Sequence, residues 1–130
     1  MNSTTQFLGQ MISPYLLVTG VGFFVSKDYY LKMLADSKHS DPITINLSGM
    51  VHFLLGLAIV LNHNLWRTAP EIIITVIGFA ASLKGAALIA VPQAALKGNE
   101  MSASVLRIIG VAFVVVGAYL GFVTYFGYFR

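Results

Sequence analysis

The sequence has no cysteine and few charged residues. Asp, Glu, Lys and Arg together make up 10% of its 130 residues. The absence of cysteine excludes a disulfide framework, a thiolate metal site and thiol catalysis. A soluble domain averages about 25% charged residues, so this chain cannot cover a surface that faces water. With 57% hydrophobic residues and a mean hydropathy of +0.79, it is predicted to have lipid as its solvent.

Four long apolar stretches predict the fold. They cover residues 7–26, 43–61, 72–91 and 105–126. Each spans roughly 20 residues, or about 30 Å of helix, which matches the hydrocarbon core of a bilayer. The pattern predicts an all-α integral membrane four-helix bundle with antiparallel, up-down spans in a single domain, 1–130. No Lys or Arg precedes the first stretch and no small-residue cleavage site follows it, so we expect it to remain as a span.

The starts of the second and third spans have capping signals. Asp41 can cap the second span, with Pro42 at its first helical position. Thr68 and Glu71 have the spacing of a capping box before the third span. The segment 27–42 mixes tyrosines and leucines with charges, and we expect it to form a short interfacial helix after the first span.

The distribution of Lys and Arg predicts the orientation. One side of the membrane would hold Lys27, Lys32, Lys38, Lys97 and Arg107, and the other only Arg67 and Arg130. The positive-inside rule then places the loops after spans one and three in the cytoplasm and both termini outside, in a bacterial inner membrane. The net charge of +3 is assigned to loops that face anionic lipid, so no nucleic-acid partner is expected.

Small residues form stripes on three of the predicted spans, with Ser48, Gly49 and Gly56 on the second. Thr75, Gly78 and Gly85 lie along the third, and Gly110, Gly117 and Gly121 lie on one face of the fourth. Membrane helices associate where small residues let backbones approach closely. These faces fit the interior of a bundle, and the Gly117–Gly121 pair equally fits a homodimer seam.

Two ionisable residues lie inside predicted spans, His52 and Lys84. In one interpretation Lys84 extends to the cytoplasmic interface and His52 bonds to a helix backbone. In the other, they form an anion-binding pocket with Ser48 and Arg107 for a lipid headgroup or an anionic small molecule. No Asp or Glu lies inside a predicted span, which argues against a carrier coupled to protons or cations.

The stretch LNHNLWRTAPE, residues 61–71, stands between the second and third spans. Trp66 fits the aromatic belt of a membrane interface, and asparagine can end a helix. A plain turn does not require His63 or Asn64, so His63, Asn64 and Trp66 make a candidate site on the outer face.

Metal, haem and catalytic sites are not expected. His52 and His63 share a helix face but lie about 16 Å apart along it, too far to bind one metal. His39 is in the predicted cytoplasmic loop, so haem could be held only between two protomers. No serine–histidine–acid set, phosphate loop or carboxylate pair can be assembled, so neither enzyme activity nor a cofactor is predicted.

Residues 52–92 resemble a family of small four-span bacterial inner-membrane proteins. The similarity is in His52, in the HN-x-W turn at residues 63–66, and in Lys84-Gly85 ahead of Pro92. Gly78-Phe79 stands where such proteins often have Gly-Trp. The resemblance implies an architecture and candidate positions but no reaction.

The sequence is interpreted as a small, non-enzymatic accessory or scaffold protein. It would pack with membrane lipid and with itself or a larger membrane partner. The alternative is a carrier or binding protein for an anionic or lipid-like ligand near Lys84 and His52, and a more remote one is a haem-binding electron-transfer subunit.

Overall fold

The structure is a computed structural model that describes residues 2–127, and all of its regular secondary structure over that range is helical. The helices are α1 (Ser3–Val25), α2 (Lys27–Asp36), the 3₁₀ helix η1 (Ser37–His39), α3 (Pro42–Asn62), α4 (Ala69–Ala90), α5 (Pro92–Lys97) and α6 (Ala103–Phe126). Helices α1, α3, α4 and α6 are each long and apolar enough to cross a membrane. The predicted all-α class with four spanning helices is confirmed.

The helices begin earlier than the apolar stretches do. Helix α1 starts at Ser3 and α4 at Ala69, where apolar runs begin at residues 7 and 72. Helical backbone hydrogen bonding does not require apolar side chains, so each helix can begin with a polar turn in the interface before the apolar stretch. Helix α5 was not predicted. Pro92, which ends α4, also serves as the first residue of α5, a position where its missing N–H costs nothing.

The capping signals are met at one helix and missed at another. At α4, the Thr68 side chain accepts from the Glu71 backbone N–H, and the Glu71 carboxylate accepts in return from the N–H of Thr68. At α3, Pro42 takes the first helical position as predicted, but the Asp41 side chain makes no capping hydrogen bond. The expected Asp41 cap is therefore wrong.

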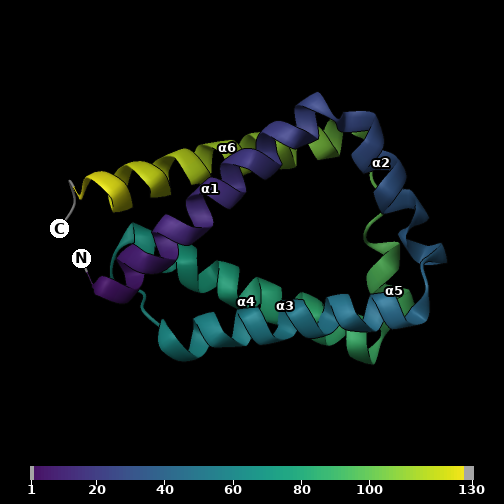
Figure 1. Ribbon diagram of the computed structural model, residues 1–130, viewed down its shortest axis with the longest axis horizontal. Coiled ribbons are helices and arrows are strands. Elements are labelled where there is room, and N and C mark those ends of the chain that lie inside the picture. Colours follow the sequence, from purple (N-terminus) through teal and green to yellow (C-terminus); the bar gives the residue numbers. More distant parts are fainter. Residues whose placement is uncertain (1, 128–130) are drawn as a thin grey trace. The chain divides into compact units, whose positions relative to one another are not determined.

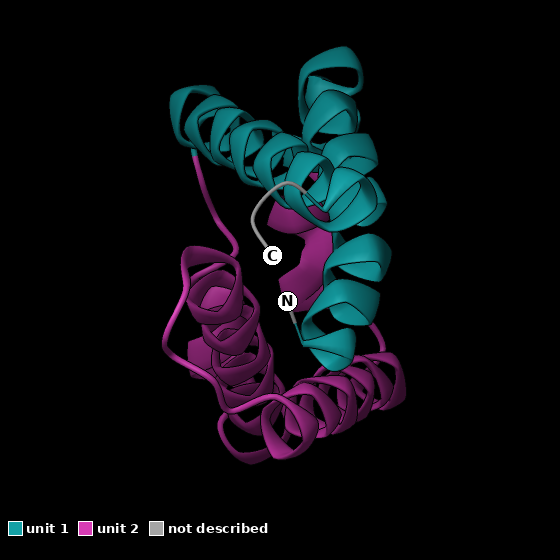
Figure 2. Ribbon diagram, turned by 90° about the vertical axis from the view of Figure 1, so that its left-hand side faces the viewer, with its two compact units in different colours: residues 1–31, 102–130 teal, residues 32–101 magenta. Residues whose placement is uncertain are grey.

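The chain forms two compact units, shown in Figure 2. One contains the residues up to 31 with those from 102 onward, and the other contains residues 32–101. Each unit has one pair of long antiparallel helices, α1 with α6 and α3 with α4, and the helices of each pair lie side by side (Figure 1).

Glycines let the backbones of α3 and α4 approach closely. A Cβ on Gly85 would lie 2.6 Å from the Gly49 carbonyl oxygen, and one on Gly56 would lie 2.7 Å from the Gly78 carbonyl oxygen. Both distances are shorter than real side chains tolerate. Close packing of this kind holds membrane helices together, because lipid removes the hydrophobic drive between them.

Glycines also let the backbones of α1 and α6 approach closely. A Cβ on Gly117 would lie 3.0 Å from the Leu16 Cβ, and one on Gly110 would lie 3.3 Å from the Gly20 carbonyl oxygen. Gly121 is looser, since its Cβ would stand 3.5 Å from the Ser13 hydroxyl. This glycine face of α6 packs against α1 of the same chain.

Side chains of α1 and α6 also satisfy backbone groups that the helices leave open. Pro14 has no N–H, so the Gln10 carbonyl loses its helical donor, and the Tyr125 hydroxyl donates to that oxygen at 2.8 Å. Near the end of α6, the amides of Gln6 and Gln10 donate to the Thr124 carbonyl at 3.3 and 3.1 Å. In a membrane such bonds matter, because hydrocarbon offers no water to replace them.

Candidate functional sites at the two ends of the α3–α4 hairpin

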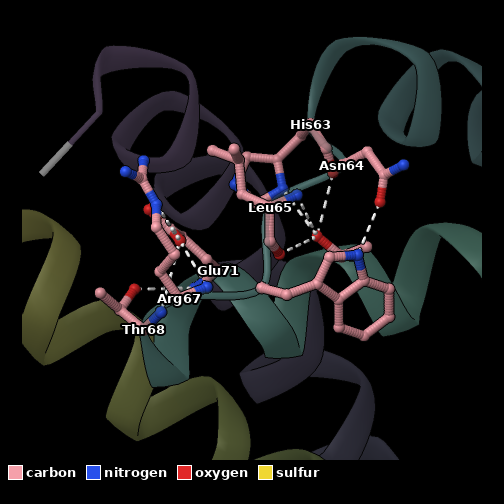
Figure 3. Close-up of polar contacts among 8 residues, drawn as sticks. His63, Asn64, Leu65, Arg67, Thr68 and Glu71 are labelled. Carbon is pink, nitrogen blue, oxygen red and sulfur yellow. Dashed lines mark hydrogen bonds and ion pairs between the residues drawn. The ribbon is translucent and has the colours of Figure 1, made fainter.

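The turn between α3 and α4, residues 63–68, is held by two side chains of α4. Thr75 bonds to the start of the turn, at His63 and Leu65. Glu71 bonds to its end, at Arg67 and Thr68 (Figure 3). Glu71 and Thr75 are four apart, so they lie on one helix face, and helical side chains lean toward the N-terminus. Both therefore extend back over the turn that precedes the helix.

The Thr75 hydroxyl is the centre of the first contact set. Its oxygen lies 3.1 Å from His63 Nδ1 and 3.3 Å from the Leu65 backbone N, and 3.0 and 2.8 Å from the carbonyl oxygens of His63 and Leu65. A hydroxyl has one proton to donate and two lone pairs. The Thr75 hydroxyl therefore donates its proton to one of the two carbonyl oxygens, and its two lone pairs accept from the Leu65 N–H and from a proton on His63 Nδ1.

The Glu71 carboxylate holds the end of the turn. It is 5% exposed, and its Oε2 accepts from the backbone N–H groups of Arg67 at 3.0 Å and Thr68 at 3.3 Å. The Arg67 Nε lies 3.9 Å from the same oxygen. Backbone donors and a nearby cation compensate for burying this carboxylate.

The three residues predicted as an outer-face site have different roles. His63 is fully buried against Thr75, so it belongs to the framework of the turn. Asn64 and Trp66 are exposed, and the Trp66 indole donates to Asn64 Oδ1 at 2.7 Å. The Trp66 ring also stacks on Phe79 with centroids 6.1 Å apart. The turn thus presents an aromatic surface with fixed orientation.

The predicted inner pair, His52 and Lys84, lies within the spans, with His52 at the middle of α3 and Lys84 in the second half of α4. His52 is half-buried, and its Nδ1 donates to the Ser48 carbonyl at 2.8 Å, one turn back on α3. Lys84 is exposed, and its Nζ reaches Asn99 Oδ1 at 3.5 Å, beyond α5. Within the described range, no hydrogen bond joins the two side chains. Arg107 is exposed on α6, in the other unit.

Two segments meet at the end of the hairpin that is remote from the 63–68 turn. Lys38, in η1, donates to Glu100 Oε1 at 2.7 Å, and the Asn99 amide donates to the Ser37 hydroxyl at 3.1 Å. The hydrogen bond and charge of Lys38 lower the pKa of the exposed Glu100 carboxyl, and Glu100 raises the pKa of Lys38. We call the pairs Lys38–Glu100 and Ser37–Asn99 the clasp.

Sequence reasoning placed Thr75 in the small-residue stripe of the third span and missed its bonds to the turn, and it missed the clasp altogether, for different reasons. The spacing of Glu71 and Thr75 was a usable signal, because two polar residues four apart at a helix start share the face that leans over the preceding turn. The clasp joins residues 62 positions apart in sequence. No local pattern marks such a pair.

These features define the class of the molecule. Four long apolar helices identify a multi-pass membrane protein of the all-α class. Comparison of the chain with protein-family models, with curated proteins and with solved structures found no match.

Proposed function

We propose that this membrane protein is a small, non-enzymatic accessory or scaffold protein of a bacterial inner membrane. It acts by packing with a larger membrane partner or with further copies of itself. The supporting observation is that several polar side chains are bonded to other parts of the same chain. Thr75 and Glu71 hold a turn, and Gln10 and Tyr125 join one helix to another. Groups engaged in this way build a rigid body for binding.

The end of the α3–α4 hairpin is the surface we assign to the partner. Trp66 is half exposed, yet it is held by Asn64 on one side and Phe79 on the other. Tryptophan is enriched among residues that dominate binding energy, and a side chain already held in place loses little entropy on binding. Arg67 beside it adds a cation with its own hydrogen-bonding fork.

The mass of the protein in mild detergent tests this function. When the protein is expressed at its natural level and extracted from membranes, we expect it to migrate in native electrophoresis as a complex much larger than one 14.1 kDa chain with its detergent. Trp66→Ala should release the single chain. Tyr29→Ala, which also removes an exposed aromatic ring but from α2, should leave the complex intact. A wild-type protein that migrates as a single chain in every mild detergent would contradict the proposal.

The proposed orientation places the hairpin turn outside the cytoplasm. Because the chain has no cysteine, single cysteines can be introduced at the exposed positions Asn64 and His39, at opposite ends of the α3–α4 pair. In intact cells, an impermeant thiol reagent should label Asn64→Cys and spare His39→Cys until the membrane is opened. The reverse pattern would invert the topology.

A further inference from the structure

A groove lies at the end of the α3–α4 hairpin that is remote from the 63–68 turn, and Lys38 of the clasp is one of its lining residues. It has a volume of about 430 Å³ and lies within the unit of residues 32–101. Side chains from the η1 segment, the start of α3, the end of α4 and α5 line it, among them Lys38, Asn46, Leu88, Ile89, Gln93 and Leu96. Four elements thus contribute to one concave surface.

The groove has both apolar and polar lining residues. Leu88 and Leu96 are almost fully buried and form an apolar floor, and the exposed Ile89 adds further apolar surface. Asn46 and Gln93 are exposed and bring two amides to the rim. A ligand that fits must combine a hydrocarbon part with a polar part.

Its position in the fold gives the depth at which such a ligand would lie. Pro42, at the start of α3, and Ile89, near the end of α4, both line the groove, and α3 and α4 are helices long enough to span the bilayer. The ends of spanning helices lie at the level of the lipid headgroups. The floor is then within reach of acyl chains and the rim within reach of headgroups.

The charge of the rim favours an anion. Lys38 is the one charged side chain among the lining residues, and two of its three ammonium protons remain for a ligand beside the bond to Glu100.

We propose that this groove binds an anionic phospholipid. Its phosphate lies between Lys38 and the amides of Asn46 and Gln93, and an acyl chain covers the Leu88–Leu96 floor. Glu100 is the resident counter-charge of Lys38, with which the headgroup competes. The site goes beyond the proposed scaffold function, and it lies elsewhere than around His52 and Lys84.

Opposite effects of two clasp variants test this site. The full-length protein is equilibrated in nanodiscs of phosphatidylcholine with increasing phosphatidylglycerol, and retained lipid is counted by native mass spectrometry. Lys38→Met should lower phosphatidylglycerol retention by about fivefold, the order expected for one lysine near an anionic surface. Glu100→Gln removes the competitor and should raise retention by roughly two- to fivefold, the equivalent of an exposed ion pair.

The two variants separate binding from mere structure. If Lys38 serves only to close the clasp, both substitutions open it and retention changes in the same direction, which would overturn the proposal. Asn46→Leu leaves the clasp intact and should still lower retention. Lys97→Met removes the same charge from α5 at a position that does not line the groove, and it should match the wild type.

Two further outcomes would reject the phospholipid. Equal retention of phosphatidylcholine and phosphatidylglycerol by the wild type would mean that charge plays no part. Displacement of phosphatidylglycerol by millimolar inorganic phosphate would mean a site for a small anion without the acyl chain. Neither result bears on the mass of the complex, so the scaffold proposal is tested separately.

Discussion

Replacement of Thr75 by valine should strongly destabilise the α3–α4 hairpin. The two side chains have nearly the same shape, so the substitution removes the hydroxyl and little else. Thr75 is fully buried, and its hydroxyl oxygen lies within hydrogen-bond distance of four groups of the turn: His63 Nδ1, the Leu65 N–H and the carbonyl oxygens of His63 and Leu65. Valine offers none of them a partner.

The expected magnitude follows from the two donors that lose the Thr75 oxygen. A buried donor left without an acceptor costs roughly 1–3 kcal/mol. His63 is fully buried and should contribute the larger share, whereas the backbone of Leu65 is half-buried and within reach of water. The free energy of unfolding should therefore fall by about 2–4 kcal/mol, a large part of the stability of a small protein.

Thr75→Ser provides the matched control. Serine keeps the hydroxyl and loses one buried methyl group, which costs about 1 kcal/mol. Reversible unfolding in mixed micelles, followed by helical circular dichroism during titration with dodecyl sulfate, measures both losses. If valine destabilises the protein no more than serine does, the hydroxyl does not hold the turn and the reasoning fails.

Two further predictions concern helix packing. Gly85→Ala would push a Cβ into the Phe53 backbone and should lower the free energy of unfolding by about 1–3 kcal/mol in the same titration. In Gly98→Ala the new Cβ meets only the Ala95 carbonyl oxygen, at 3.4 Å, so stability should change by less than about 0.5 kcal/mol. Equal tolerance of the two substitutions would contradict the close approach of α3 and α4. Tyr125→Phe should lower the free energy of unfolding by about 1 kcal/mol in the wild type. In a Pro14→Ala background the same substitution should cost almost nothing, because alanine restores the helical N–H to the Gln10 carbonyl. If Tyr125→Phe costs the same in both backgrounds, Tyr125 does not bond to that oxygen.

The class of this protein and its spanning helices could be read from the sequence because they depend on local chemistry. A bilayer requires every backbone group inside it to be bonded, so a stretch of about 20 apolar residues has little choice but a helix. The Thr68–Glu71 capping box is equally local, since both partners are three residues apart. The glycine stripes indicated which faces pack, but gave no sign of which helix each one meets.

The roles of the polar residues were decided by tertiary structure. His63 was predicted as a candidate for binding, and the fold buries it beneath Thr75 instead. Lys84 was paired with His52 by depth, yet its four-carbon stem lets the ammonium reach Asn99 at the helix end. The partners of a long or buried polar side chain depend on which distant segments the fold brings close. The Lys38–Glu100 bond and the groove behind it exist only because α5 and the η1 segment meet at one end of the hairpin.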